Sequence, residues 1–433
     1  MRLALPGLLL ALLVVGCSHP MSSVMSSPQS GHRHTVPAIE HIVIVEMENR
    51  SFDEMFGTYP GANGIPMDGN GLPTVACNPD PASGQCILPY HDTSTINHGG
   101  PHNDAAERTD LDGGAMDGFI KTAENPQGKF HDYFPDEVMG YHTCAELPTY
   151  CSLAAQGVLF DNFFAATSSW STMAHLFLVS GWSATCSGQD QPMSCVPNND
   201  VNIKQLPHPD LAWTDITYLL HAQGVSWGYY VFGSGHPFIQ PDGDGEAPGP
   251  DAAFNKPGLW NPLPLFDDVT NDGQIGDIQP GKNFDAACAL GTLPAVSFVI
   301  PSFNTSDHPT ADLVAGQLFV QTMVSELEKS PDWASTVVFI QWDEWGGFYD
   351  HVPPPVVDGL GYGFRNPMIM LSPFAAPGTI DHQLLSSDAE LKLIEDTFLG
   401  GQRLDPATDG RPDSRPVVRE IYPGLGDLRN DLQ

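Results

Sequence analysis

Short apolar runs and longer segments of helical periodicity alternate along this 433-residue chain. β-Branched runs typical of buried strands occur at residues 39–46, 225–231, 295–300, 336–341 and 367–371. Helical spacing, or a start or stop signal for a helix, occurs at residues 51–56, 171–181, 211–224, 311–329 and 388–398. Strands that alternate with helices favour a parallel sheet with helices on both faces. The sequence therefore predicts an α/β fold, a three-layer α/β/α sandwich with a mainly parallel central sheet.

Glycine and proline are unusually frequent: the 43 glycines and 40 prolines make up roughly a fifth of the chain, against roughly 12% in average usage. We therefore expect long irregular loops around the core. These residues are densest at 232–292, which we interpret as an irregular insertion within a main domain spanning residues 38–425. Residues 426–433 are expected to form a C-terminal tail.

The amino terminus has the pattern of an export signal. One arginine precedes an apolar run that ends at Val15, and Gly16 and Cys17 follow. The run is too short to span a membrane. We expect residues 1–16 to be a signal peptide and Cys17 to be lipidated, as in a bacterial lipobox, with residues 17–37 as a flexible tether. The alternative is an ordinary signal peptide cut nearby, and both place the protein in the periplasm or outside the cell.

The remaining cysteines favour disulfides over a zinc site, because an exported protein meets oxidising conditions and no C-x-x-C spacing is present. Three pairs lie close in sequence and would leave Cys288 unpaired: Cys77 with Cys86, Cys144 with Cys151, and Cys186 with Cys195. Spacing alone does not determine connectivity, so this pairing is a hypothesis.

The chain is strongly acidic, with 17 Lys and Arg residues against 52 Asp and Glu residues and a formal charge of −35. This balance argues against nucleic acid as a partner, because a polyanion requires a basic surface. An apolar content of 41% argues against disorder. An anionic substrate would be repelled by such a surface unless a cation lies in the site.

Carboxylates follow two of the predicted strands, at the sheet edge where open α/β folds place functional residues. Glu48 and Asn49 follow the first strand, and the adjacent pair Asp343 and Glu344 follows the strand at 336–341. A single acidic residue after a strand is usually a helix cap. Two adjacent carboxylates repel each other unless a cation or a proton relieves them. These oxygen ligands suit a divalent cation of undetermined identity.

Ser171 is a candidate nucleophile, because it lies at the start of a predicted helix, where free backbone N–H groups favour an anion. The alternative is an ordinary serine N-cap. The chain has no G-x-S-x-G elbow, which disfavours an α/β-hydrolase esterase.

Several segments resemble the bacterial phosphoesterase family of phosphatidylcholine-type phospholipases C and related acid phosphatases, in the alkaline-phosphatase-like superfamily. They are VEMENRSFDEMFG, GGPHNDAAERTDLDGGAMDGF, SWSTMAHLFLVSG, the DHP around His308, WDEWGGFYDHVPPP and GYGFRNPMIMLSPF. The resemblance implies a metal site of Glu48, Asn49, Ser171, Asp343 and Glu344, and catalytic roles for Ser171, His102, His308 and His351. Two positions depart from the family pattern, namely Glu344, where many relatives have Asp, and Ala174, where relatives often have Asn.

We therefore expect an exported metal-dependent phosphoesterase of the phospholipase C type that attacks phosphorus through Ser171. Two alternatives remain, an acid phosphatase acting on monoesters and a non-catalytic binding protein of the same fold. The expected partner is a phospholipid or a small phosphoester, and activity is expected to be favoured below neutral pH. Four other histidines are candidates only: His98, His175, His236 and His382.

Overall fold

A sheet of eight strands forms the centre of the fold in a computed structural model that describes residues 38–124, 134–188, 190–201, 211–233 and 254–432. The strand order is β10-β9-β11-β1-β12-β13-β6-β14. Strand β13 is antiparallel to both of its neighbours, and the other pairs are parallel. The strands are β1 (His41–Met47), β6 (Val158–Phe160), β9 (Trp227–Val231), β10 (Ile278–Pro280), β11 (Val296–Ile300), β12 (Thr336–Trp342), β13 (Met368–Leu371) and β14 (Thr379–Asp381).

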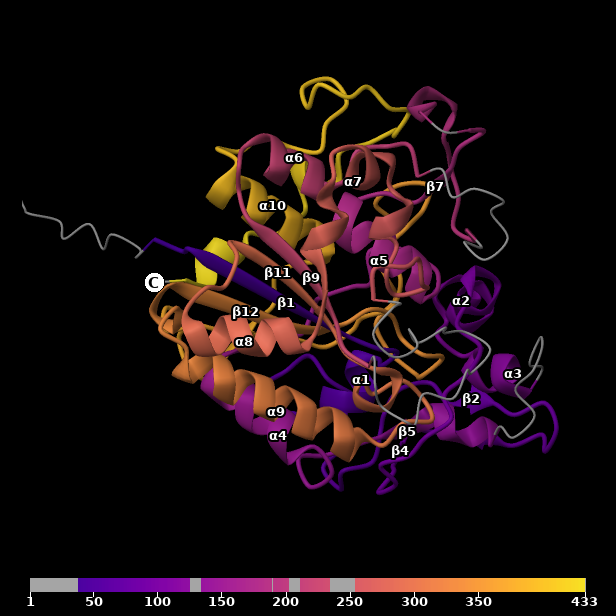
Figure 1. Ribbon diagram of the computed structural model, residues 1–433. Coiled ribbons are helices and arrows are strands. Elements are labelled where there is room, and N and C mark those ends of the chain that lie inside the picture. The colour runs from indigo at the N-terminus through magenta and orange to yellow at the C-terminus, as the bar shows by residue number, and fades with distance from the viewer. Residues whose placement is uncertain (1–37, 125–133, 189, 202–210, 234–253, 433) are drawn as a thin grey trace, which may run out of the picture. The chain divides into compact units, whose positions relative to one another are not determined.

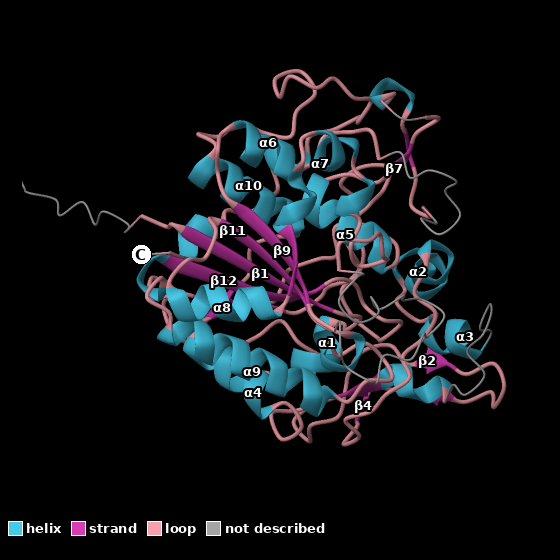
Figure 2. Ribbon diagram, in the orientation of Figure 1, coloured by secondary structure: helices cyan, strands magenta, loops and turns pink. Residues whose placement is uncertain are grey.

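Helices cover both faces of this sheet (Figures 1 and 2). One face packs on α4 (Pro148–Gln156), α8 (Lys282–Leu290) and α9 (Leu313–Lys329). The other packs on α5 (Ser171–Ser180), α6 (Ile216–Ala222), α7 (Asp267–Asn271) and α10 (Ser387–Phe398). Alternate β1 residues enter the two cores, since Ile42 and Ile44 belong to one and Val43 and Val45 to the other. The predicted three-layer α/β/α sandwich is confirmed.

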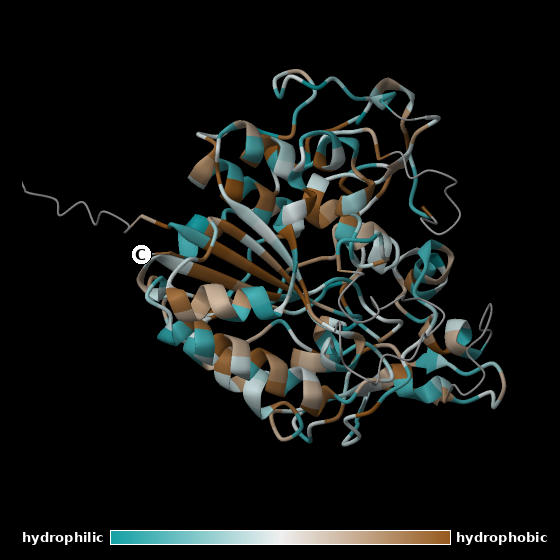
Figure 3. Ribbon diagram, viewed as in Figure 1, coloured by the Kyte–Doolittle hydropathy of each residue, from teal (hydrophilic) through white to brown (hydrophobic). Residues whose placement is uncertain are grey.

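Most predicted elements are present with shifted ends, and the apolar central strands stand out in Figure 3. The helix expected at 211–224 begins only at Ile216, because the Asp215 side chain accepts the Thr217 N–H at 2.7 Å and caps it. Strands β6 and β14 were not predicted, since three-residue strands carry no readable alternation.

A third apolar cluster lies beyond the carboxyl edge of the sheet. It includes residues of α2 (Asp104–Leu111) and α3 (Phe119–Glu124), together with Trp345 and Tyr349 from the segment that follows β12. Helix α1 (Phe52–Phe56) follows β1 directly and is capped by Ser51. Short elements complete this region: β2 (Asn78–Pro79), β3 (Cys86–Ile87), β4 (Tyr90–His91), β5 (Gly140–Tyr141), η1 (Asp112–Gly114) and η2 (Pro135–Met139).

Two segments differ from the sequence interpretation. The described part of 232–292, expected to be an irregular insertion, supplies α7, edge strand β10 and α8. Near the carboxyl end, Leu428 and Leu432 are buried in the core, and Leu432 bridges to Ala375. Residues 1–37, with the predicted signal peptide, tether and lipidated Cys17, lie outside the described residues.

The remaining short elements are β7 (Ala184–Thr185), β8 (Val196–Pro197), η3 (Pro192–Ser194), η5 (Leu263–Leu265), η6 (Gln274–Asp277), η7 (Phe303–Thr305), η8 (Trp333–Ser335), η9 (Arg419–Ile421) and η10 (Leu428–Asp431).

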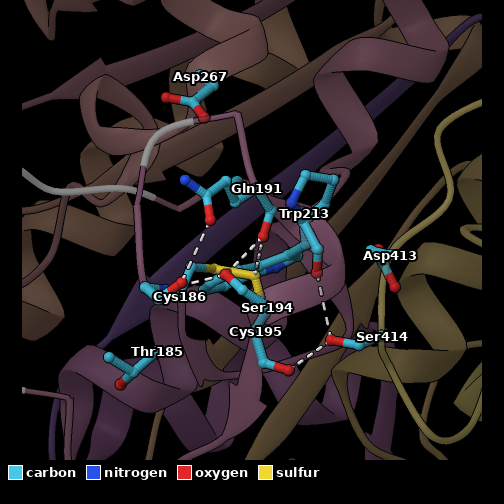
Figure 4. The surroundings of a disulfide bond; sticks show 12 residues. Thr185, Cys186, Gln191, Ser194, Cys195, Trp213, Asp267, Asp413 and Ser414 are labelled. Carbon is cyan, nitrogen blue, oxygen red and sulfur yellow. Dashed lines mark hydrogen bonds between the residues drawn. A yellow bond between two sulfur atoms is a disulfide. The ribbon is translucent and has the colours of Figure 1, made fainter.

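Three disulfides close short loops, and their pairing is the one predicted: Cys77–Cys86, Cys144–Cys151 and Cys186–Cys195. Cys288 is free and buried. Figure 4 shows the third bridge, where the Ser414 hydroxyl donates to the carbonyl of Cys195 and joins this loop to the carboxyl-terminal region. None of the described helices combines the length and the apolarity required to cross a bilayer.

Candidate active site

The candidate site lies at the carboxyl ends of β11, β1 and β12, which are neighbours in the sheet. Glu48 and Asn49 follow β1, His308 follows β11, and Asp343 and Glu344 follow β12. All five residues are buried, with side chains no more than 4% exposed. Parallel strands therefore bring together the residues that the sequence placed after separate apolar runs.

Asn49 joins the loop after β1 to the loop after β12. Its backbone N–H donates to Asp343 Oδ1 at 2.7 Å, and its side-chain amide donates to Glu344 Oε1. Asn49 adopts a left-handed conformation with φ of 61°, which Asn tolerates better than most residues. Gly346 is required opposite it, because a Cβ there would lie 2.2 Å from the Asn49 carbonyl oxygen. The geometry of both loops thus depends on this contact.

Glu48, His175 and Asp343 form a group whose potential ligand atoms lie within 4.8 Å of one another. Glu48 Oε1 accepts from His175 Nε2 at 2.9 Å. The other oxygens, Glu48 Oε2 and Asp343 Oδ2, have no hydrogen-bond partner among the described residues. Buried carboxylate oxygens without partners are costly unless a proton or a cation satisfies them. The donor set fits a divalent cation.

Burial dominates the electrostatics of the three carboxyl groups. It raises the pKa of Glu48, Asp343 and Glu344 above the ordinary range of each group. Repulsion from Asp343 raises the pKa of Glu48 and of Glu344 further. The charged forms are therefore unstable together without a neighbouring positive charge, and a bound cation would reverse these shifts.

Ser171 is the first residue of α5 and is 4% exposed. Its Oγ donates to Asn49 Oδ1 at 3.4 Å, which directs the hydroxyl at the residue that joins the loops after β1 and β12. The alternative of an ordinary N-cap serine is wrong, because Trp170 occupies the N-cap position and makes no side-chain capping bond. The start of α5 therefore brings a free N-terminal turn and a hydroxyl to the site.

His102 and His308 face the same region, with ring centroids 6.2 Å apart. His102 Nδ1 donates to the Gly100 carbonyl at 2.8 Å, and its Nε2 lies 3.8 Å from Glu344 Oε1. His308 Nδ1 donates to the carbonyl of Pro309, and burial lowers the pKa of His308 to about 3. Because a carbonyl only accepts, Nδ1 carries the proton and leaves Nε2 of neutral His308 as an acceptor.

His351 belongs to a different network. Its Nδ1 bonds to Asp53 Oδ2 at 2.7 Å, and Arg365 bridges Asp53 and Asp350. Burial lowers the pKa of His351, but the hydrogen bond and charge of Asp53 outweigh it and raise that pKa overall. Among the described residues, no hydrogen bond or ring contact joins His351 to Ser171, Glu48 or Asp343. The predicted catalytic role of His351 has no contact in its favour.

His175 is one of the four histidines that the sequence analysis named only as candidates. Its ring contacts the Glu48 carboxyl group of the potential metal site. The available signal was its position four residues after Ser171, because residues i and i+4 share a helix face. His98 pairs with Glu137, and His382 pairs with Asp161. His236 lies outside the described residues.

The family model described as the Phosphoesterase family matches residues 39–399. A buried group of carboxylates at the edge of a parallel α/β sheet suits the hydrolysis of phosphate esters, and the chain belongs to this phosphoesterase family.

Similar proteins carry phospholipase C names. Phospholipase C B of Mycobacterium tuberculosis is 28% identical over 423 residues, covering 86% of this chain and 75% of the relative. Non-specific phospholipase C6 of Arabidopsis thaliana is 27% identical over 387 residues, covering 81% and 65%. Non-hemolytic phospholipase C of Pseudomonas aeruginosa is 24% identical over 442 residues, covering 90% and 59%. Among solved structures, a protein in the alkaline phosphatase superfamily from Vibrio parahaemolyticus aligns with a TM-score of 0.37 and 14% identity, covering 83% and 77%.

Proposed function

We propose that the protein is an exported, metal-dependent phosphoesterase of the phospholipase C type with Ser171 as its nucleophile. The observation that carries the proposal is the position of the Ser171 hydroxyl. It lies at the first turn of α5, contacts Asn49, and interacts with Asp343, which belongs to the group of potential ligands with Glu48. Activation of a serine by a neighbouring cation requires this combination of a hydroxyl and oxygen ligands.

The residues that would hold the cation together with Ser171 are Glu48, Asn49, Asp343 and Glu344. His175 bonds to Glu48 Oε1 and orients it. When bound, a divalent cation supplies positive charge that lowers the pKa of the Ser171 hydroxyl and polarises a phosphoryl oxygen. Asn49 holds the loops after β1 and β12 at a fixed separation, so the ligands are in place before substrate arrives.

In the proposed reaction, Ser171 Oγ forms a bond to phosphorus as the bond from phosphorus to the leaving alkoxide breaks. Asp343, which interacts with the Ser171 side chain, accepts the hydroxyl proton. His102, with a proton on each ring nitrogen, donates from Nε2 to the departing alkoxide, whereas neutral His308 presents Nε2 as an acceptor to the water of the next step. Water then cleaves the phosphoserine intermediate and regenerates Ser171.

The substrate class rests on the relatives. Bacterial and plant proteins that align over at least 81% of this chain are named phospholipases C. We therefore propose cleavage of a phospholipid diester on the diacylglycerol side of phosphorus. A phosphomonoester is the comparison substrate, because the same nucleophile and cation also serve a monoesterase.

A test uses the purified protein with phosphatidylcholine vesicles and p-nitrophenyl phosphate as substrates, with and without a chelator. Ser171→Ala is expected to lower kcat at least about a thousandfold, because the attacking oxygen is removed. Ser180→Ala is the matched control, since Ser180 is also buried on α5 but its hydroxyl bonds to the Leu176 and Trp182 carbonyls and the Trp213 indole N–H, and not to the carboxylate group. Full turnover by Ser171→Ala would refute the nucleophile. Chelator-resistant turnover by a protein free of metal would refute the cation.

Export and anchoring are part of the proposal. Three disulfides favour an oxidising compartment. Expression in a bacterial host followed by fractionation tests the anchor, with Cys17→Ser expected to move the protein from the membrane to the soluble exported fraction. Membrane retention of Cys17→Ser would contradict lipidation at that position.

A further inference from the structure

The segment at residues 416–423 exposes its apolar side chains and buries its charged ones. Val417 and Ile421 are 42% and 62% exposed, whereas Arg419 and Glu420 are each 3% exposed. A segment that faces water normally has the opposite arrangement, with its charged groups outside. Single exposed apolar side chains are common on soluble proteins, but this segment inverts the usual order along its length. The inversion indicates that this face has a partner less polar than water.

A second apolar segment, at residues 352–357, has the sequence VPPPVV, and none of its residues is buried. Val356 is 89% exposed, the highest value among the exposed large apolar side chains of the described residues. The three prolines have no backbone N–H group, and their fixed φ angle stiffens the loop. This loop therefore presents apolar side chains with few backbone donors that would have to remain in water.

An ion pair joins the two segments. Arg419 binds Asp358 through two hydrogen bonds, from Nε to Oδ2 at 2.8 Å and from Nη2 to Oδ1 at 2.7 Å. Gly359 and Val417 line the same pocket, so the ends of the two segments lie side by side. We call three exposed side chains of these segments the apolar patch: Val356, Val417 and Ile421.

The apolar patch is connected to the loop that carries the candidate nucleophile. Arg419 Nη1 donates to the Ala166 carbonyl, and the Ser168 hydroxyl donates to the Leu360 carbonyl at 2.9 Å. Ser168 precedes Ser171 by three residues. These contacts fix the segments of the patch relative to the loop that leads to Ser171.

We propose that the apolar patch docks on a zwitterionic phospholipid bilayer. This inference rests on the proposed function, under which the substrate lies in a bilayer. Transfer of exposed valine and isoleucine side chains from water into the bilayer interface is favourable. The charged neighbours Arg419 and Asp358 neutralise each other, so docking requires no anionic lipid. The formal charge of −35 disfavours an anionic membrane, which leaves a zwitterionic surface as the matching partner.

The test measures binding of the full-length protein to phosphatidylcholine vesicles by flotation, with Ser171→Ala to prevent hydrolysis and Cys17→Ser to remove the predicted lipid anchor. Adding Val356→Glu is expected to lower the partition coefficient into vesicles at least about tenfold, because a charged side chain would have to leave water. Ile421→Glu makes the same change in the other segment. Leu290→Glu is the matched control and should bind like the parent, because Leu290 is 73% exposed on α8, which covers the other face of the sheet.

Hydrolysis gives a second readout in the protein that keeps Ser171. Val356→Glu is expected to slow hydrolysis of phosphatidylcholine vesicles and to leave turnover of soluble p-nitrophenyl phosphate unchanged, since a soluble substrate requires no docking. The binding assay decides the inference even if the protein hydrolyses neither substrate, a result that would refute the proposed function alone.

Two results would overturn the docking surface. The first is vesicle binding by Val356→Glu and Ile421→Glu equal to that of the parent, and either variant decides the question if the other does not fold. The second is sedimentation of the parent as a dimer that Val356→Glu dissociates, because the occupant of the patch would then be a second copy of the chain.

Discussion

Replacement of His175 by alanine is expected to destabilise the protein and to weaken cation binding at the proposed metal site. His175 is fully buried on α5, with Nε2 2.9 Å from Glu48 Oε1 and Nδ1 3.5 Å from the Tyr229 hydroxyl. Burial lowers the pKa of His175 to about 3, so the ring is neutral at pH 7. Because a carboxylate only accepts, neutral His175 donates its Nε2–H to Glu48.

The magnitude has two parts. Removal of the imidazole leaves a buried oxygen of Glu48 without its hydrogen bond, which reduces the free energy of unfolding by about 1–3 kcal/mol. The cavity left by the ring adds about 2 kcal/mol, at the lower end of large-to-small substitutions in a core. The total of roughly 4 kcal/mol is a large share of the 5–15 kcal/mol typical of a folded domain. His175→Gln retains a donor and is expected to recover about half of the loss.

Chemical denaturation of the chelator-treated protein measures the stability effect, and calorimetric titration with a divalent cation measures the affinity. His175→Ala is expected to lower that affinity about 10- to 100-fold, because Glu48 loses the partner that orients it. His221→Ala is the control, since His221 is exposed on α6 and a surface change shifts stability by less than about 0.5 kcal/mol. A loss below about 1 kcal/mol with unchanged metal affinity for His175→Ala would refute this account.

Three further predictions concern stability. Burial raises the pKa of Asp307 to about 7 from an ordinary value of 3.8. The contribution of this group to the free energy of unfolding is therefore present at low pH and is lost as pH rises from about 4 through 7. In wild type, the free energy of unfolding measured with urea should fall with pH by up to roughly 1.4 kcal/mol per pH unit because of Asp307. Asp307→Asn is expected to remove this slope, and an unchanged slope would contradict the prediction. Tyr150→Phe removes the hydroxyl that donates to Asp307 Oδ2 at 2.6 Å and should lower the free energy of unfolding by about 1–3 kcal/mol in the same assay. Replacing Cys144 and Cys151 by serine opens a loop of sequence separation 7 and is expected to lower the free energy of unfolding by about 2–3 kcal/mol. This difference from the wild type should disappear when both proteins are measured under reducing conditions.

The sequence predicted the central strands and the residues that follow them, because long apolar runs have one stable environment. Strand β12 is buried at every position, and its end fixes Asp343 and Glu344 at the sheet edge. Glu48 and Asn49 follow β1 for the same reason. Local patterns were sufficient here, since each residue is placed by the strand that precedes it.

Residues placed by distant contacts were harder to predict. All of α5 is buried, so its sequence carries no polar face that would single out His175. His351 is held by Asp53, which lies 298 positions earlier, and only the folded chain shows that this contact leads away from Ser171. The short strands β6 and β14 join the sheet through pairing with each other and with β13, which no local pattern encodes.

The acidic surface leads to a prediction about the choice of membrane. The formal charge is −35, so vesicles that contain anionic lipid repel the protein, whereas zwitterionic phosphatidylcholine does not. We expect hydrolysis of phosphatidylcholine vesicles at low salt to slow when phosphatidylglycerol is mixed into them. Raising the ionic strength from about 0.01 M to about 0.1 M shortens the Debye length from about 30 Å to about 10 Å and should restore most of the rate. The rate on pure phosphatidylcholine serves as the control and should change little with salt. Faster hydrolysis of the anionic vesicles at low salt would mean that a local positive surface, and not the overall charge, governs the approach to the membrane.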